Sequence, residues 1–167
     1  MARFLRRFGL PAAIVAAAVG AVMPIVGTRE DVVRIARHEL GSDDWPKYCA
    51  DALGVEQVTD RYEWCGMFTL WALHQAGLAH DIHWKVGLGY LYRLPQVPRG
   101  QLPKPGDMAY FDRPFQHHAI VEWVDPERGL VSTLNGNGGG GKVTRVVRPI
   151  TDATDYYSIE PLLWVGE

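Results

Sequence analysis

Residues 65–76 form the segment that most constrains how this chain can fold. The apolar side chains of this segment fall on almost every face of a helix, and Gly77 supplies a stop signal directly after it. A helix that is apolar all round has to be enclosed, so it is expected in the middle of a domain. Its first residue, Cys65, stands where a polar loop ends, and the thiol is therefore expected on a rigid element.

Two further helices are predicted before this segment. Thr28 precedes apolar residues at helical spacing over 29–41, with an acid in capping-box position and Gly41 as the stop. A short second helix is expected to open near 44–46, where proline is tolerated in the first turn, and to close before Gly54.

Strand patterns dominate the second half of the chain. Alternating or strand-like runs separated by turn signals occur at 107–111, 117–124, 130–134, 142–148 and 162–165. Helices followed by strands predict an α+β fold with an antiparallel sheet of about five strands. The stretch 82–105 is expected to be irregular, with a helical turn around 87–93. The glycine run 138–141 is interpreted as a hairpin connection, because it lacks the ending of a phosphate loop.

The two ends of the chain differ in character. Three arginines precede an uncharged, apolar run over 8–26, which is typical of an export signal, although a run of this length also suits a membrane anchor. Ala18 and Gly20 offer small residues for cleavage. Residues 28–167 then form one domain of catalytic size, and an exported, periplasmic or extracellular location is expected.

Charge content limits the partners of this chain, and cysteine content allows two interpretations of Cys49. Three of the 17 basic side chains and none of the 19 acidic ones lie in residues 1–27, which leaves a net charge of −5 on the remainder and argues against a nucleic-acid partner. Cys49 and Cys65 could form a disulfide in an oxidising compartment. The alternative is that Cys49 packs as a small apolar residue on the inner face of its helix.

Cys65 has the position of a nucleophile. Unpaired backbone N–H groups at a helix start stabilise a thiolate, so the pKa of the Cys65 thiol is expected to fall when a histidine is also near. Strand alternation over 117–124 sends His117 and His118 to opposite faces, so that only one of them faces the helix. Asn135 and Asn137 end the next strand, where an amide could orient an imidazole. Cysteine, histidine and a polar orienting residue would make a papain-type triad.

Four pieces of the sequence, in this order, resemble the CHAP amidase/peptidase family and its NlpC-type relatives. They are Tyr-Glu-Trp-Cys-Gly-Met-Phe at 62–68, Lys-Pro-Gly-Asp-Met-Ala-Tyr-Phe at 104–111, His-His-Ala-Ile-Val at 117–121 and Asn-Gly-Asn at 135–137. The resemblance places the family's cysteine on Cys65 and its histidine on His117. The family's third residue is a glutamate, and here Asn135 stands in its place, so the imidazolium would lack a negative partner.

The resemblance implies a papain-like fold and hydrolysis of an amide bond in peptidoglycan, through a thioester on Cys65. Site support is expected from Trp64 and Asn137, with the Cys65 backbone N–H in the oxyanion hole. Substrate contacts are expected from the aromatic or imidazole side chains of Trp84, Tyr90, Tyr92 and His118. Two alternatives stay open: a cell-wall binding domain without turnover, and an acyl transferase that resolves the thioester with an amine.

No cofactor or metal is expected. His74, His80 and His83 are the one histidine group that suggests zinc, but His74 belongs to the enclosed helix and no fourth ligand is evident. The expected partners are peptidoglycan or its peptide fragments, with possible membrane association through the N-terminal segment.

Overall fold

The computed structural model describes residues 27–85 and 89–164, with no description of the side chain of residue 164. The predicted signal or anchor therefore lies outside the described residues, except for Gly27. None of the helices in these two ranges is long and apolar enough to cross a membrane.

In the described part of the chain, three α-helices precede the strands, as the sequence predicts: α1 (Arg29–His38), α2 (Trp45–Leu53) and α3 (Cys65–Gln75). Thr28 and Asp31 form the predicted capping box at the start of α1. Gly54 ends α2 in the left-handed conformation, at φ 70°. The irregular segment before the sheet contains the short 3₁₀ helix η1 (Leu91–Arg93), close to the expected turn.

Five strands form one antiparallel sheet, so the predicted α+β fold class is confirmed. They are β1 (Met108–Phe111), β2 (His117–Asp125), β3 (Leu130–Asn135), β4 (Thr144–Pro149) and β5 (Asp155–Tyr157), in the order β4-β3-β2-β1-β5. Between β4 and β5 lies the 3₁₀ helix η2 (Ile150–Asp152).

The fifth strand is not the predicted one. The apolar run expected to form a strand from residue 162 begins inside the 3₁₀ helix η3 (Glu160–Trp164), and the edge of the sheet is formed by β5 instead. Pro161 has no N–H for a ladder and fits the first turn of a helix, which favours the helical form. In β5 the ring of Tyr157 reaches the main core, while its backbone pairs with Met108.

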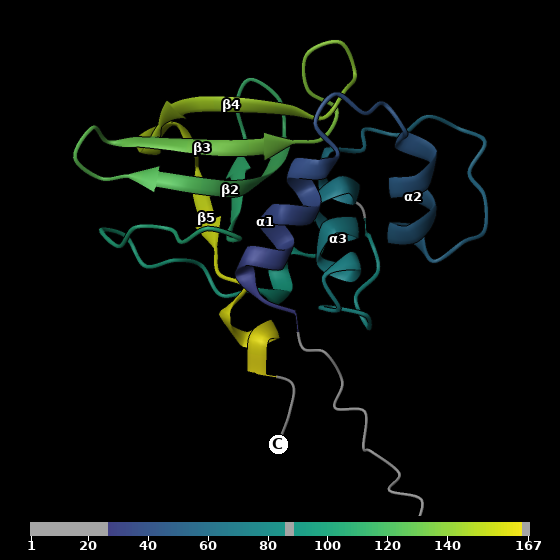
Figure 1. Cartoon of the computed structure of the whole chain (residues 1–167), viewed down its shortest axis with the longest axis horizontal. Helices are drawn as coiled ribbons and strands as arrows, with labels where there is room; N and C mark the ends of the chain where they lie inside the picture. Colours follow the sequence, from purple (N-terminus) through teal and green to yellow (C-terminus); the bar gives the residue numbers. More distant parts are fainter. Residues whose placement is uncertain (1–26, 86–88, 165–167) are drawn as a thin grey trace, which may run out of the picture.

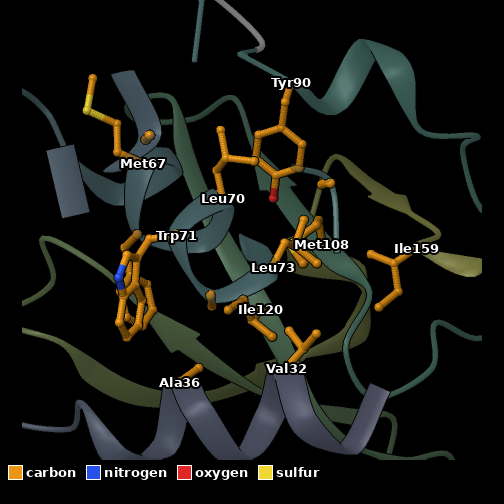
Figure 2. Packing of buried hydrophobic residues seen from close by; sticks show 14 of the residues in the cluster. Val32, Ala36, Met67, Leu70, Trp71, Leu73, Tyr90, Met108, Ile120 and Ile159 are labelled. Atoms are coloured by element: carbon orange, nitrogen blue, oxygen red, sulfur yellow. The ribbon is translucent and has the colours of Figure 1, made fainter. Parts of the chain in front are cut away.

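Helix α3 occupies the middle of the molecule, as its all-apolar surface requires. It lies between α1 and α2 and contacts β2 and β3 (Figure 1). Figure 2 shows the packing around it: Val32 and Ala36 of α1 point toward α3, and Met108 and Ile120 come from the strands. These side chains belong to one large buried cluster. Burial of this helix fixes the position of its first residue, Cys65.

The opposite face of the sheet carries a second, smaller core. Its buried members are Ala109, Phe111, Ala119, Val121 and Val131, covered in part by residues of the 150–156 segment. Both faces of β2 are therefore packed. The predicted alternation is confirmed, because Ala119 and Val121 belong to this second core whereas Ile120 belongs to the core around α3.

Candidate active site

Cys65 opens α3 and lines a pocket of about 960 Å³. The residue before it, Trp64, does not cap the helix with its side chain. The backbone N–H groups of the first turn therefore donate no hydrogen bond to the side chain of Trp64. The Cys65 side chain is largely enclosed, with 6% of the residue exposed. A cysteine on a rigid helix start, facing a pocket, is a suitable place for a nucleophile.

Burial raises the pKa of the Cys65 thiol above its ordinary value, and hydrogen bonds from the backbone N–H groups of His118 and Gly66 only partly offset this. The net direction is opposite to the fall predicted for a thiol at a helix start with a histidine near it. Desolvation of the thiolate is the stronger effect here. The Cys65 thiol consequently needs a neighbouring base to accept its proton when it reacts.

His118 is the candidate for such a base. Its Nδ1 lies 3.9 Å from Cys65 Sγ, within the range of a hydrogen bond to sulfur. The ring is 3% exposed and is held between Trp84, in edge-to-face contact at 5.5 Å, and Tyr110, at 5.4 Å between ring centroids. Packing of this kind fixes the orientation of the imidazole toward the thiol.

The sequence resemblance pairs Cys65 with His117, and the structure does not show this pairing. His117 points to the other face of β2, opposite Phe111 of β1, because consecutive strand residues alternate. His118 therefore occupies the position facing α3. Both histidines still line the same pocket, since they are the first two residues of β2 and the pocket lies at that end of the strand.

His117 is paired with Asn135, as predicted, through an interaction of 3.0 Å between Nε2 and Oδ1. The Asn135 amide nitrogen donates to Thr133 O and Oγ1 and to Thr144 O, so its oxygen is the atom left to face the imidazole. The His117 Nε2 must therefore carry hydrogen and Nδ1 is the acceptor of the neutral ring. Burial, followed by the charge of Arg148, lowers the pKa of His117, although Asn135 acts in the opposite direction.

Asn137 contributes to the pocket wall from a left-handed backbone position, at φ 52°. Its amide nitrogen donates to Glu63 Oε2 at 2.7 Å and thereby ties the end of β3 to the loop before Cys65. The structure thus places Asn137 where it can support the loop that carries the nucleophile.

The predicted aromatic contacts divide into two groups. Trp84 lines the pocket, as expected. Trp64 is fully buried and stacks on Tyr48 at 5.2 Å, so its side chain supports the site from within the core rather than from the pocket. Tyr90 is also fully buried, with its hydroxyl donating to Thr69. Tyr92 is 56% exposed and lies outside the pocket lining, so neither tyrosine is placed to contact a substrate there.

Sequence reasoning missed a large part of the pocket wall. The additional lining residues are Tyr62, Glu63, Met67, Phe111, Arg113, Pro114, Phe115, Gln116 and Arg148. The alternation that places His117 also places its cross-strand partner Phe111 on the same face, and this signal was available. Arg148 could not be found in that way, because it contacts Phe111 from β4, which is not a neighbour of β1 in the sheet.

The structure also bears on the possible disulfide of Cys49 and on the possible metal site at the other histidines. Cys49 and Cys65 are both free, so the possible disulfide is absent, and burial raises the pKa of Cys49 to about 11. His74 bonds to Asp51 and to the carbonyl of Ile82, and stacks on His80. Within residues 27–85 and 89–164, no group of three or more His, Cys, Asp or Glu side chains is arranged to hold a metal ion.

The fold and the site together define an α+β domain with a cysteine at the start of its enclosed helix. Residues 57–137 match the family model of the CHAP domain. These residues therefore form a CHAP domain, and the resemblance predicted from the sequence is confirmed. The matched segment includes Cys65, both histidines and the Asn135 position.

Two solved structures are similar to this chain. One is described as the crystal structure of Ly7917 (16% identity, TM-score 0.49) and the other as the crystal structure of Ly7917 with the hydrolyzing product of MDP (14% identity, TM-score 0.44). Each alignment covers 78% of this chain and 62% of the other, so this chain spans less than two thirds of those proteins. Among curated proteins, none gives a significant match.

Proposed function

We propose that this protein is a peptidoglycan hydrolase that cleaves an amide bond through a thioester on Cys65. The observation that carries the proposal is the pairing of Cys65 Sγ with His118 Nδ1 at 3.9 Å, in a pocket of about 960 Å³ within a CHAP domain. A pocket of this volume accommodates a peptide or sugar-peptide segment.

In the first step, His118 Nδ1 accepts the proton of the Cys65 thiol as sulfur attacks the amide carbonyl carbon. The carbonyl oxygen then carries negative charge. The backbone N–H groups of Gly66 and Cys65, at the start of α3, and of His118, on β2, act on the Cys65 thiol, and they are the proposed oxyanion donors.

Collapse of the tetrahedral intermediate breaks the carbon–nitrogen bond, and the His118 imidazolium gives its proton to the departing amine. The acyl group is then a thioester on Cys65. Water attacks this thioester while His118 accepts one of its protons, which then passes to the sulfur as the carboxylic acid product leaves. The enzyme returns to its starting protonation state after one water molecule has been consumed.

His117 also lines this pocket, and it is paired with Asn135. We propose that Asn135 holds His117 as a neutral ring that positions the substrate, rather than as the base that activates Cys65. The support for this role is that Asn135 fixes the tautomer at Nε2 and that burial lowers the pKa of His117.

We also propose that the chain is exported, because peptidoglycan lies outside the cytoplasm and residues 1–27 have the pattern of a signal or an anchor. The proposed location is periplasmic or extracellular, with membrane association if the segment is retained.

Digestion of purified peptidoglycan tests the proposed reaction. The protein is incubated with insoluble peptidoglycan, and the released fragments are identified by mass spectrometry together with the amino groups they expose. We expect Cys65→Ala to lower the release by at least about 1,000-fold, because the nucleophile is removed. Cys49→Ala is the matched control, since Cys49 is a buried thiol outside the pocket lining.

The products distinguish the remaining possibilities. A new amino terminus on the first stem-peptide residue would assign the cut to the bond between sugar and peptide, and an internal amino group would assign it within the peptide. Fragments joined to an added amine would indicate acyl transfer. Equal release by wild type and Cys65→Ala, or binding to peptidoglycan without release, would contradict the proposed hydrolysis.

A further inference from the structure

Arg148 lies in the wall of the proposed catalytic pocket, and the described residues give it no ion partner. It comes from β4, where it pairs with Val131 of β3, and its guanidinium carbon lies 4.4 Å from the ring centroid of Phe111. Phe111 is 4% exposed, so the cation rests on a ring that is itself fixed in the second core. This contact orients the guanidinium plane but supplies no negative charge.

Three other arginines in the described part of the chain have carboxylate partners. Arg29 pairs with Asp107 and Glu160, and Arg37 and Arg145 both pair with Glu122. Among the described residues, no carboxylate oxygen lies within 4.0 Å of the Arg148 guanidinium, and its Nε is enclosed without an acceptor.

The environment of Arg148 opposes its charge. Burial lowers the pKa of this guanidinium, and the attraction of Asp152 does not overcome the effect. A partly buried cation without a close counter-ion lowers the stability of the folded protein, and an anion bound from solution would offset that loss.

Charged residues of both signs line the pocket. Arg148 and Glu63 both act electrostatically on His117, and exposed Arg113 is a further lining residue. The carboxylate of Glu63 accepts a hydrogen bond from the amide of Asn137. Arg148 has no such polar partner at its Nε among the described residues, so it is the charged group in the pocket wall that is suited to an added anionic group.

We propose that Arg148 is a specificity-determining residue that binds a carboxylate of the peptide part of the substrate, with Arg113 contributing a second positive charge at the rim. The planar guanidinium matches a carboxylate with two parallel hydrogen bonds. Stem peptides of peptidoglycan carry free carboxylates that some cell walls convert to carboxamides. The inference rests on the proposed function, since it assigns a substrate class to the same site.

A binding measurement tests the proposed role of Arg148 without turnover of the substrate. The full protein with Cys65→Ala is titrated calorimetrically with the peptide L-Ala-γ-D-Glu-L-Lys bearing a free α-carboxylate on D-Glu, and with the same peptide bearing a carboxamide there. We expect the carboxylate form to bind about 10- to 100-fold more tightly, as is usual for a charge-assisted pair. Arg148→Gln in the same background is expected to reduce this preference to twofold or less, and Arg148→Lys to retain part of it.

Arg99→Gln is the matched control, because it removes the same charge from an exposed site outside the pocket lining. Circular dichroism verifies that each variant is folded. Equal binding of the two peptides, no binding of either, or a preference that survives Arg148→Gln would overturn the proposal. Failure of the proposed hydrolysis is seen separately, as absence of Cys65-dependent release from peptidoglycan.

Discussion

At the residue scale, adjacent side chains on β2 have different environments. His118 lies against the thiol of Cys65, and His117 is hydrogen-bonded to Asn135 on the other face of the strand. The two imidazoles meet again in one pocket because it opens at the end of the strand. One site thus contains the proposed base for Cys65 and a second imidazole whose Nε2 is held by Asn135.

Gly66 provides a test of how closely this arrangement is packed. A Cβ atom at this position would lie 2.2 Å from Cη2 of Trp84 and 3.1 Å from Nδ1 of His118. We expect Gly66→Ala to move the Trp84 ring and disturb His118, lowering peptidoglycan hydrolysis by about 10- to 100-fold with little change in folding. Activity and melting temperature are measured together. Gly139→Ala is the control, since its Cβ would meet no atom within 4 Å; equal activity of the two variants would show that the packing is unimportant.

The sequence predicts the environment of these residues only in part. Alternation shows that His117 and His118 face opposite sides, but it does not show which side α3 covers. The family pattern selects the first histidine, whereas the register that pairs Tyr110 with His118 places the second one toward α3. The contribution of Arg148 depends on a contact between distant strands, and no local pattern contains that information.

At the element scale, Glu122 joins a helix to three strands. Its carboxylate accepts hydrogen bonds from Arg37 of α1, Ser132 of β3 and Arg145 of β4. Desolvation alone would raise the pKa of Glu122, but the hydrogen bonds from Arg145, Arg37 and Ser132 outweigh it and lower the pKa to about 2. The group is 3% exposed, so this network holds α1 against the sheet from within the structure.

The lowered pKa predicts how stability changes with pH. Ionised Glu122 stabilises the folded state above its ordinary pKa of 4.5, and this contribution is lost as the pH falls toward about 2. We expect Glu122→Gln to lower the free energy of unfolding at pH 7 by about 1–3 kcal/mol and to flatten its decline below pH 4.5. Urea unfolding at a series of pH values measures the free energy of unfolding and its decline with pH. Glu127→Gln, at an exposed turn, is the control, and parallel pH curves for Glu122→Gln and wild type would refute the assignment.

The elements themselves are largely predictable because most have local signals. Gly54 and the Thr28 capping box mark helix ends, and the alternating pattern marks β2. The three-residue strand β5 has too few positions to show a period, and its pairing with β1 is decided by tertiary contacts.

At the scale of the whole molecule, the packed structure already includes Gly27. A Cβ atom at this position would lie 1.6 Å from the carbonyl oxygen of Ala76, so the chain passes too close to the end of α3 for a side chain. Arg29, two residues later, forms salt bridges with Asp107 and with Glu160, and Glu160 lies near the other end of the chain.

These contacts predict the effect of truncation. A variant that begins at Gly27 is expected to keep the melting temperature of the full chain, whereas one that begins at Val32 loses the capping box and the Arg29 bridge and is expected to melt several degrees lower. Calorimetric melting of the two variants compares them directly. Equal melting temperatures would show that residues 27–31 contribute nothing to the fold. If export includes cleavage, the mass of the exported protein is expected to place its first residue before Thr28.

The pairing of Cys65 with His118 is tested most directly by the rate at which iodoacetamide alkylates Cys65 between pH 4 and 9, followed by peptide mass in wild type, His118→Ala and His117→Ala. Cys49 is an internal reference, because burial raises its pKa to about 11 and keeps it unreactive. We predict that His118→Ala slows alkylation of Cys65 at least about tenfold up to pH 8, since burial raises the pKa of the thiol and no other base replaces His118, while His117→Ala stays close to wild type. A loss of reactivity in His117→Ala with none in His118→Ala would contradict this account and assign the base to the first histidine.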